Sequence, residues 1–352
     1  MATDRVLSTR ERNRALLARQ LLLERSPLPL TRALEQVAGL QAQYAPSAYV
    51  GLWSRLRDFP REELTRALEQ RRAVQATLMR VTIHVVSAGD YPLLAEAIRR
   101  PRRAWWSRVQ RHQVEGLDME AVAALLRERL ADGPLRQAEL ASLLAAEELP
   151  RVAWSGAGLW LDLVRVPPSG TWEQRRADLY GLADDWLGRP SATEAEGLEL
   201  LVRRYLGGFG PASPKDLANW AGLPVTTVRP VMERLAPRRF RDEHGEELFD
   251  LPSAPLPHPD TPAPVRFLPT WDATLLAHAR GTQILPERHR GRVFNTRTPH
   301  SVPTFLVDGA VAGSWRHERG RVRLEPFAPL PRRARAELDE EAERLAAFHA
   351  NG

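Results

Sequence analysis

Apolar residues recur at helical spacing along most of the chain, and turn-forming residues divide the pattern into similar segments. In the clearest segment, 194–250, EAEGLELLVRRYLGGFG predicts a first helix that ends at glycines. Ser213 is placed to cap a second helix, and LPVTTVRPVMERL starts a third beyond Gly222. RRFRDE and EELFDL then predict two strands joined at His244 and Gly245. Three helices followed by a hairpin are typical of a winged helix-turn-helix unit.

The same order of elements occurs twice upstream in a looser form. The first copy contains ERNRALLARQLLLE, TRALEQVAGLQAQ and APSAYVGLWSRL, and we expect the extended run ATLMRVTIHVV to close it. The second contains MEAVAALLRERLAD, RQAELASLLAAE and WSGAGLWLDLVRV, followed by a turn at 167–170. Both copies carry Gly-Leu-Trp in the third helix. Because an internal repeat recovers one architecture from separate stretches, we predict three winged-helix units, at residues 1–115, 116–192 and 193–252.

The C-terminal part of the chain follows a different pattern. Prolines are concentrated in 253–264, which predicts a linker. Beyond it, VRFLPTW, PTFLV, AVAGSWRHE and RVRLEPF are strand-like, with Asp308-Gly309 and Arg319-Gly320 where hairpin turns are expected. RRARAELDEEAERLAAFHA predicts a terminal amphipathic helix. The predicted fold class is α+β, mainly α: tandem winged helix-turn-helix units followed, in 265–352, by a small antiparallel β-sheet or barrel.

Composition removes several classes of function. The 352 residues include no cysteine, which excludes disulfides, thiolate nucleophiles and cysteine-based zinc sites. The nine histidines are scattered without a metal-ligand spacing, so we expect neither a metal nor another cofactor. No apolar run is long enough to span a bilayer, and no signal-peptide pattern opens the chain. We therefore expect a cytoplasmic, nucleoid-associated protein without a membrane role.

The charge of the chain suits a nucleic-acid partner. The net charge is +6, and Lys215 is the only lysine among 50 basic residues. A GC-rich genome would produce the same bias, but arginine also binds phosphate in a bidentate way. The most basic stretch is RRPRRAWWSRVQRH, whose Trp105 and Trp106 either stack on DNA or enter the core. The candidate DNA contacts from this stretch are Arg99, Arg100, Arg102, Arg103 and Arg108.

The predicted third helices are poorly equipped to read a DNA sequence. Such helices need Arg, Asn or Gln where they meet base edges. APSAYVGLW and WSGAGLWLDL are apolar, and Pro230 interrupts LPVTTVRPV. The DEHGEE turn at 242–247 would repel phosphate. We expect these units to act more as a scaffold than as sequence readers.

Two glutamines, Gln41 and Gln43, follow an apolar helix and precede Pro46, so that both side chains can point into one cleft. Taken alone, they are also compatible with ordinary surface positions. LQAQY at 40–44 resembles the QxQ catalytic motif of the AlkZ/YcaQ-type winged-helix DNA glycosylases. Other stretches that resemble this family are MRVTIHVV, RVPPSGTW, YLGGFGPASPKDLANWAGL, FLPTWDATLLAH and VPTFLVDGAVAGSW.

The resemblance implies tandem winged helices and a β-rich C-terminal part around a positively charged concave face. It also implies that Gln41 and Gln43 are the catalytic pair, and that the partner is double-stranded DNA with alkylated bases. Members of the family remove alkylated, cationic purines, and some unhook interstrand crosslinks.

The residue types are compatible with this chemistry. A glutamine amide cannot act as a general base at neutral pH, but it can hold a water molecule in place. A purine that alkylation at N7 or N3 has made cationic needs little protonation to leave, so positioning the water is sufficient. Lys215 belongs to the scaffold-like third unit, and no other lysine can form a Schiff base. We predict a monomeric, monofunctional enzyme that leaves an abasic site.

Several further interpretations stay open at this level. Arg80, Thr82 and His84 alternate on a predicted strand, where they either line the cleft beside the glutamines or face the core. Asp272 is expected to cap the helix ATLLAH, and the Asp308-Gly309 turn either enters a DNA groove or closes the barrel. The alternative functions are a non-catalytic DNA-binding protein or transcriptional regulator, and a module for protein contacts.

Overall fold

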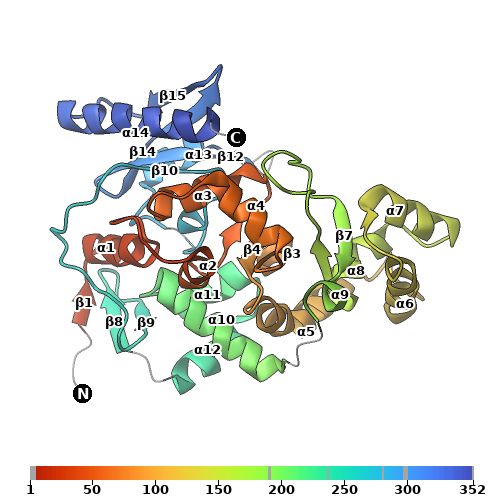
Figure 1. The fold of residues 1–352 in the computed structure, drawn as a ribbon. Helices are drawn as coiled ribbons and strands as arrows, with labels where there is room; N and C mark the ends of the chain where they lie inside the picture. The colour runs from red at the N-terminus through yellow and green to blue at the C-terminus, as the bar shows by residue number, and fades with distance from the viewer. Residues whose placement is uncertain (1–4, 189–191, 236–237, 280, 296–299, 351–352) are drawn as a thin grey trace.

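The computed structural model describes residues 5–188, 192–235, 238–279, 281–295 and 300–350. Helices form most of the body of the molecule, and the C-terminal strands lie with a long helix at one end of it (Figure 1). The predicted mixture of helices with small antiparallel sheets is confirmed. In the described part of the chain, no helix is both long and apolar enough to cross a membrane.

The first part of the chain begins with a short strand and a capped helix, and it ends with a hairpin followed by a long helix. Ser8 accepts a hydrogen bond from the Glu11 backbone, and the Glu11 carboxylate accepts one from the Ser8 backbone, which fixes the start of the first helix. The elements are β1 (Arg5–Leu7), α1 (Thr9–Arg19), α2 (Leu30–Gln36), β2 (Leu40–Gln41), α3 (Pro46–Arg55), α4 (Arg61–Glu69), β3 (Ala73–Thr77), the 3-10 turn η1 (Met79–Val81), β4 (Ile83–Ser87) and α5 (Tyr91–Val109).

The run ATLMRVTIHVV is a hairpin and not one extended strand, so that prediction was wrong. β3 and β4 pair antiparallel, from Ala73 opposite Ser87 to Thr77 opposite Ile83. The backbone reverses at η1, where Arg80 and Val81 have φ of 53° and 60°. The apolar pattern continues through the turn because the residues that enter it, Leu78 and Met79, are buried. The sequence pattern therefore gave no sign of the reversal.

The next part of the chain extends the same sheet. Its elements are α6 (Met119–Leu130), β5 (Leu135–Arg136), α7 (Gln137–Ala146), α8 (Val152–Trp160), β6 (Leu163–Arg165), β7 (Leu179–Leu182) and α9 (Ala183–Leu187). β3 pairs with β6 through Gln75 opposite Arg165 and Ala76 opposite Val164. The result is a six-stranded sheet in the order β2-β4-β3-β6-β7-β5. Strands from the first two predicted units thus share one sheet.

The third part has the predicted order of three helices and a hairpin. Its elements are α10 (Glu194–Phe209), α11 (Pro214–Ala221), α12 (Val225–Arg234), β8 (Arg238–Asp242) and β9 (Glu247–Asp250). Ser213 caps α11, and Gly222 ends it in the left-handed conformation, as the sequence indicated. α10 can pack closely along α5 because Gly197 has no side chain, since a Cβ there would collide with the Leu93 carbonyl oxygen. The pairing of β1 alongside β8 was not predicted.

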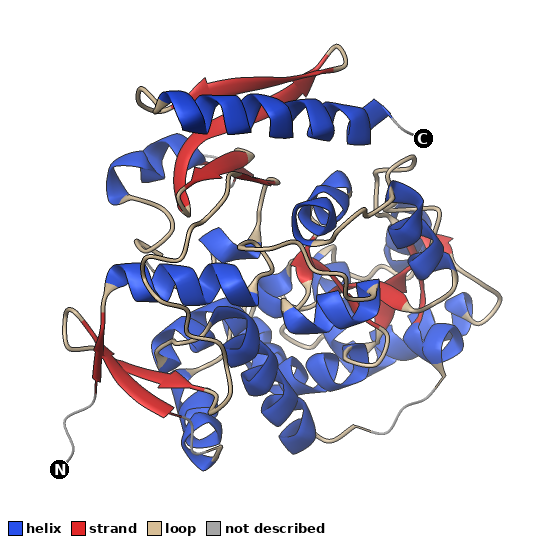
Figure 2. Ribbon diagram, turned by 60° about the vertical axis from the view of Figure 1, so that its left-hand side comes forward, coloured by secondary structure: helices blue, strands red, loops and turns tan. Residues whose placement is uncertain are grey.

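The C-terminal part forms the expected antiparallel sheet. Its elements are β10 (Arg266–Leu268), η2 (Ala273–Leu275), η3 (Glu287–His289), α13 (Arg290–Val293), β11 (Phe294–Asn295), β12 (His300–Ser301), β13 (Thr304–Val307), β14 (Ala310–Glu318), β15 (Arg321–Pro326) and α14 (Arg332–Ala350). The sheet has the order β10-β13-β14-β15, and α14 lies alongside it (Figure 2). Both predicted hairpin turns have positive φ at their two central residues.

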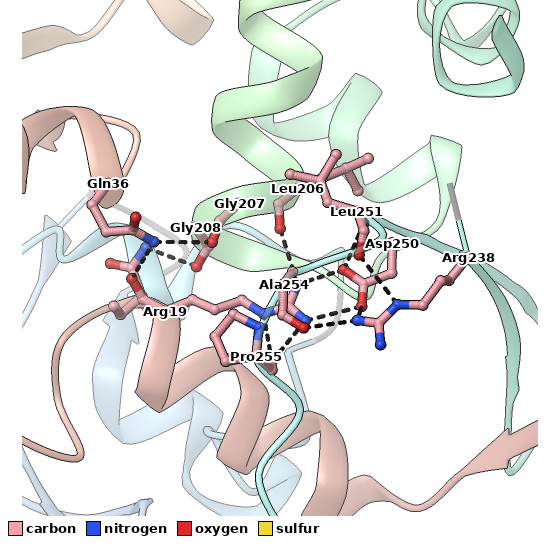
Figure 3. A network of polar contacts seen from close by, with 11 residues as sticks. Arg19, Gln36, Leu206, Gly207, Gly208, Arg238, Asp250, Leu251, Ala254 and Pro255 are labelled. Carbon is pink, nitrogen blue, oxygen red and sulfur yellow. Dashed lines mark hydrogen bonds and ion pairs between the residues drawn. The ribbon is translucent and has the colours of Figure 1, made fainter. Parts of the chain in front are cut away.

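A buried ion network joins α1 to the β8–β9 hairpin and to the proline-rich segment 253–264 (Figure 3). Arg19 contacts both carboxylate oxygens of Asp250 at 2.6 and 3.0 Å, and Arg238 contacts the same carboxylate at 2.8 Å. The two arginines also donate to the carbonyls of Pro255 and Ala254, respectively. The segment predicted as a linker is therefore fixed along the surface of the helical body.

Candidate active site at the β3–β4 turn

Gln41 lies at the end of β2, opposite His84 of β4. Its side chain is buried, and its Oε1 accepts a hydrogen bond of 3.0 Å from the Arg80 guanidinium. The same guanidinium donates a second bond, of 2.6 Å, to the carbonyl of Trp220 in α11. Arg80 thus fixes the orientation of the Gln41 amide and joins the first part of the chain to the third.

Gln43 lies two residues further on and is exposed. Its Oε1 accepts a hydrogen bond of 2.6 Å from the backbone N–H of Ile83, the first residue of β4. The side-chain carbonyls of both glutamines therefore accept from the same hairpin, one from the tip and one from the strand. This arrangement holds both amides at one place in the fold.

The structure corrects the positions expected for Arg80, Thr82 and His84. Arg80 lies in the left-handed tip of the turn, and Thr82 ends η1, where its hydroxyl donates to the Met79 carbonyl at 2.9 Å. Only His84 lies in β4. The predicted alternation on one strand is therefore wrong, because the chain reverses between Leu78 and Thr82. Arg80 nevertheless reaches Gln41.

His84 is buried beside the catalytic candidates. Its Nδ1 lies 3.0 Å from the Thr82 carbonyl, while its Nε2 has no hydrogen-bond partner. Burial lowers the pKa of His84 to about 3, against the effect of the Thr82 carbonyl, and the nearby charges of Arg80 and Arg102 lower it further. The imidazole is therefore neutral at neutral pH, with Nδ1 as the donor.

A cavity of about 330 Å³ opens beside Gln43. It lies between the β3–β4 hairpin, α5, α8 and the β6–β7 strands. Trp154 and Tyr180 meet edge to face in its wall, with ring centroids 5.2 Å apart. Arg165, also in the wall, donates to the Thr77 hydroxyl at 3.0 Å and to the Tyr180 hydroxyl at 3.3 Å. The aromatic and polar groups give the cavity the character of a small-molecule or nucleobase pocket.

A larger groove, of about 1030 Å³, lies on the other side of the turn. Its walls come from η1, α5, α11 and the start of α12. Val81 and Arg102 line both the groove and the cavity beside Gln43. Among the described residues that line the groove, Glu194 is the only acidic one, and it lies 3.7 Å from Arg100. In the described part of the chain, the basic residues that line it are Arg80, Arg100, Arg102, Arg108 and Lys215.

The basic residues of α5 divide into exposed and engaged groups. Arg100 and Arg108 are exposed and line the groove. Arg99 binds the Asp162 carboxylate at 2.8 Å, and Arg103 donates to the Leu159 carbonyl at 2.7 Å. Arg102 is buried, donates to the Leu78 carbonyl at 3.0 Å, and has a pKa lowered by burial to about 10. Three of the five candidates therefore also serve the protein's own structure.

The two tryptophans of α5 have different environments. Trp106 is 4% exposed and packs edge to face on Trp160. Trp105 is 48% exposed and lines the groove. The core interpretation therefore holds for Trp106 and not for Trp105, because adjacent residues on a helix point about 100° apart.

Asp272 and Asp308 have structural partners. Asp272 accepts two hydrogen bonds from the buried Arg55 and caps η2 through Thr274. The expected capping role is confirmed, although ATLLAH begins with a 3-10 turn and is not a full helix. The carboxylate of Asp308 binds Arg10 and Arg14 of α1. That turn therefore packs against the body of the molecule.

Sequence reasoning missed three features of the site. The cavity residues Trp154, Arg165 and Tyr180 come from the second unit and are brought to Gln43 only by the β3–β6 pairing. Val81 was not singled out, because its pattern suggested a strand. Lys215 was placed away from the site, yet it is exposed in the same groove as Arg80. The stretch RVPPSGTW, which begins at Arg165 and resembles the family, was the one sequence signal that pointed to these cavity residues.

Comparison with known proteins was made by sequence and by structure. The sequence profile described as DNA glycosylase AlkZ-like matches residues 34–348. A solved structure described as Streptomyces sahachiroi DNA glycosylase AlkZ is similar over 98% of each chain, with a TM-score of 0.78 and 20% sequence identity. A search of curated protein sequences gave no significant match. Because the profile extends over most of the sequence, this chain belongs to the AlkZ-like DNA glycosylase family.

Proposed function

We propose that this DNA glycosylase hydrolyses the N-glycosidic bond of alkylated, cationic purines in double-stranded DNA, with Gln41 and Gln43 as the catalytic pair. The observation that carries the proposal is the anchoring of both glutamine carbonyls to one hairpin, with Gln43 in the wall of a cavity. A side-chain amide that is already held by the fold can orient a water molecule without losing further conformational entropy.

The proposed reaction does not need a strong general base. Alkylation at N7 or N3 places a positive charge on the purine, so the base departs with the electrons of the glycosidic bond and becomes neutral. The water oxygen bonds to the sugar C1′, and its proton passes to solvent. The Gln43 Oε1 accepts one bond from Ile83 and has a second lone pair that can accept from this water. Gln41, held by Arg80, supports the same position.

The groove of about 1030 Å³, here called the cationic groove, is the proposed DNA-binding surface. Arg100, Arg108 and Lys215 are exposed in it, and the opposing carboxylate of Glu194 is already close to Arg100. Such a surface neutralises phosphates without reading bases, which suits a lesion that can occur in any sequence. A purine in an interstrand crosslink alkylated at N7 carries the same positive charge, so we include crosslinks among the proposed substrates.

We also propose that the enzyme acts as a monomer and is monofunctional. Lys215 lines the groove but not the cavity that contains Gln43, so its amine is not positioned at the proposed site of the reaction. Purified protein should leave abasic sites uncut, and borohydride should not trap it on DNA. If borohydride traps the wild-type protein on DNA but does not trap Lys215→Arg, the monofunctional assignment is wrong.

The central experiment measures base release from duplex DNA that contains N7-methylguanine. The wild-type enzyme should release the base, Gln43→Ala should lower the single-turnover rate by about 100-fold or more, and Gln41→Ala should also lower it. Gln113→Ala is the matched control, because Gln113 is an exposed glutamine bonded only within its own turn. Normal release by Gln43→Ala would sink the proposed site.

The experiment also separates catalysis from binding. If wild-type protein binds the duplex with a steep salt dependence but releases no base, the non-catalytic DNA-binding function is supported. Binding that does not weaken with salt would instead favour a module for protein contacts. Release of N7-methylguanine but not of a crosslinked purine would limit the substrate range to small lesions.

A further inference from the structure

Val81 stands at the tip of the β3–β4 turn in an unfavourable backbone conformation. Its φ is 60°, in the left-handed region, and the residue is 48% exposed. A β-branched residue is rare in this region, because its branched Cβ crowds the neighbouring carbonyl. Asparagine or glycine would satisfy the backbone better. Because Val81 is about half exposed, packing in the free protein offsets only part of the conformational cost of its backbone.

Contacts from several elements hold the tip in place. Arg80 bridges the Trp220 carbonyl and the Gln41 side chain. The backbone of Gly222 also packs against it, so that a Cβ added at Gly222 would lie only 3.3 Å from the Arg80 backbone nitrogen. The Leu78 carbonyl accepts from both the Val81 N–H and the buried Arg102. The exposed isopropyl group is therefore presented on a rigid support, and strain that the surroundings maintain is common at functional sites.

The position of Val81 relates it to both parts of the proposed site. It lines the cavity that contains Gln43 on one side and the cationic groove on the other. Gln43 is bonded to the backbone of Ile83, two residues further along. A duplex whose backbone follows the groove would therefore meet Val81 between its phosphates and the catalytic amide.

We propose that Val81 is an apolar wedge that enters the base stack beside the damaged nucleotide and opens its glycosidic bond to Gln43. The inference rests on the proposed glycosylase function and adds a residue that contacts the substrate. Aliphatic side chains inserted between base steps unstack DNA, and a side chain held rigidly avoids the additional loss of its own conformational entropy. Val81 has the apolar surface, the exposure and the rigid support that this role requires.

The test compares Val81→Asn with Val109→Asn. Asn fits the left-handed tip and removes the apolar surface, so Val81→Asn should fold at least as stably as wild type in urea unfolding. Val109 is 52% exposed at the end of α5 and does not line the groove or the cavity, which makes it a matched control. Val81→Asn should slow single-turnover release of N7-methylguanine by about tenfold or more, while Val109→Asn should not.

Unstacking can be measured separately from bond cleavage. A duplex with 2-aminopurine beside an N7-methylguanine on a 2′-fluoro sugar, which resists loss of the base, reports unstacking as increased fluorescence. Wild type and Val109→Asn should raise this fluorescence, and Val81→Asn should not, although it still binds the duplex. Equal fluorescence and equal release for Val81→Asn would overturn the wedge while leaving the glycosylase function intact. Absence of release by the wild type would instead remove the function on which it rests.

Discussion

At the scale of single residues, the site depends on amides and hydrogen bonds more than on titrating groups. The acidic and basic residues near the glutamines are engaged by the protein, and His84, the nearest histidine, is buried in its neutral form. Arg80 is the residue on which the geometry depends most, since its guanidinium has one bond to Gln41 and another to α11. In the proposed mechanism Arg80 orients the Gln41 amide and is not required to contact the sugar.

Replacement of Arg80 by alanine should therefore slow chemistry more than it weakens binding. We expect the single-turnover rate of base release to fall about tenfold, because the Gln41 amide loses its fixed orientation. A double-mutant cycle with Gln41→Ala provides the control. If Arg80 acts through Gln41, the double variant should be about as slow as Gln41→Ala alone; fully additive losses would contradict the positioning role.

His84 should make the fold sensitive to acid. Its folded pKa of about 3 lies below its ordinary value of 6.5, so the unfolded chain binds the extra proton first as the pH falls. The contribution of His84 to the free energy of unfolding is fully present above pH 6.5. It is lost between pH 6.5 and about 3, at roughly 1 kcal/mol per pH unit. Urea unfolding at pH 7 and pH 5 should show a smaller loss for His84→Asn than for wild type. His112→Asn, at an exposed position, should behave as wild type.

At the scale of elements, α5 combines two roles on different faces. One face packs on α10 and α8, while the other presents Arg100, Trp105 and Arg108 to the groove. The engaged arginines, Arg99 and Arg103, join α5 to the second unit through Asp162 and Leu159. One basic stretch of sequence therefore combines exposed arginines with arginines that join elements of the protein to one another.

Alanine at Arg100 and Arg108 should weaken DNA binding without changing its sequence preference. Each substitution should reduce the slope of log affinity against log salt by about 1, since each removes one phosphate contact. Arg129→Ala supplies the control, because Arg129 is exposed on α6 and lines neither the groove nor the cavity. Fluorescence anisotropy over a range of salt concentrations measures the slope. An unchanged slope for both groove variants would place the phosphate track elsewhere.

At the scale of the whole molecule, buried ion networks hold together segments that are far apart in sequence. Asp250 joins Arg19 of α1 to Arg238 of β8, and Asp272 joins Arg55 of α3 to the C-terminal part. The largest apolar core contains residues from Leu16 to Val311, so its packing crosses every predicted unit. Each predicted unit thus contributes residues to the largest core, and a separate smaller cluster, which includes Leu126 and Leu140, lies mostly within the second unit.

Asp250→Asn should therefore destabilise the entire fold. Removal of the charge leaves Arg19 fully buried without its ion partner, which typically costs about 3–5 kcal/mol. The urea midpoint should fall, while the rate of base release well below the midpoint should stay near that of wild type. Asp260→Asn is the control, because its carboxylate is 83% exposed. Equal midpoints for the two variants would show that the network contributes little stability.

The sequence by itself determined what short-range physics controls. Helix periodicity, the Ser213 cap, the Gly222 stop and the glycine hairpins predicted most elements, and LQAQY, through its resemblance to a family motif, led to the proposal of Gln41 and Gln43 as the catalytic pair. Only the tertiary structure decided what depends on long-range packing. One such feature is the turn within a continuous apolar run. The others are the β3–β6 pairing that brings Arg165 to the site and the hydrogen bond from Arg80 to Gln41. Local patterns report which face of a segment is buried, but not which distant segment buries it. The surroundings of Gln41 and Gln43 could therefore be known only once the chain had folded around them.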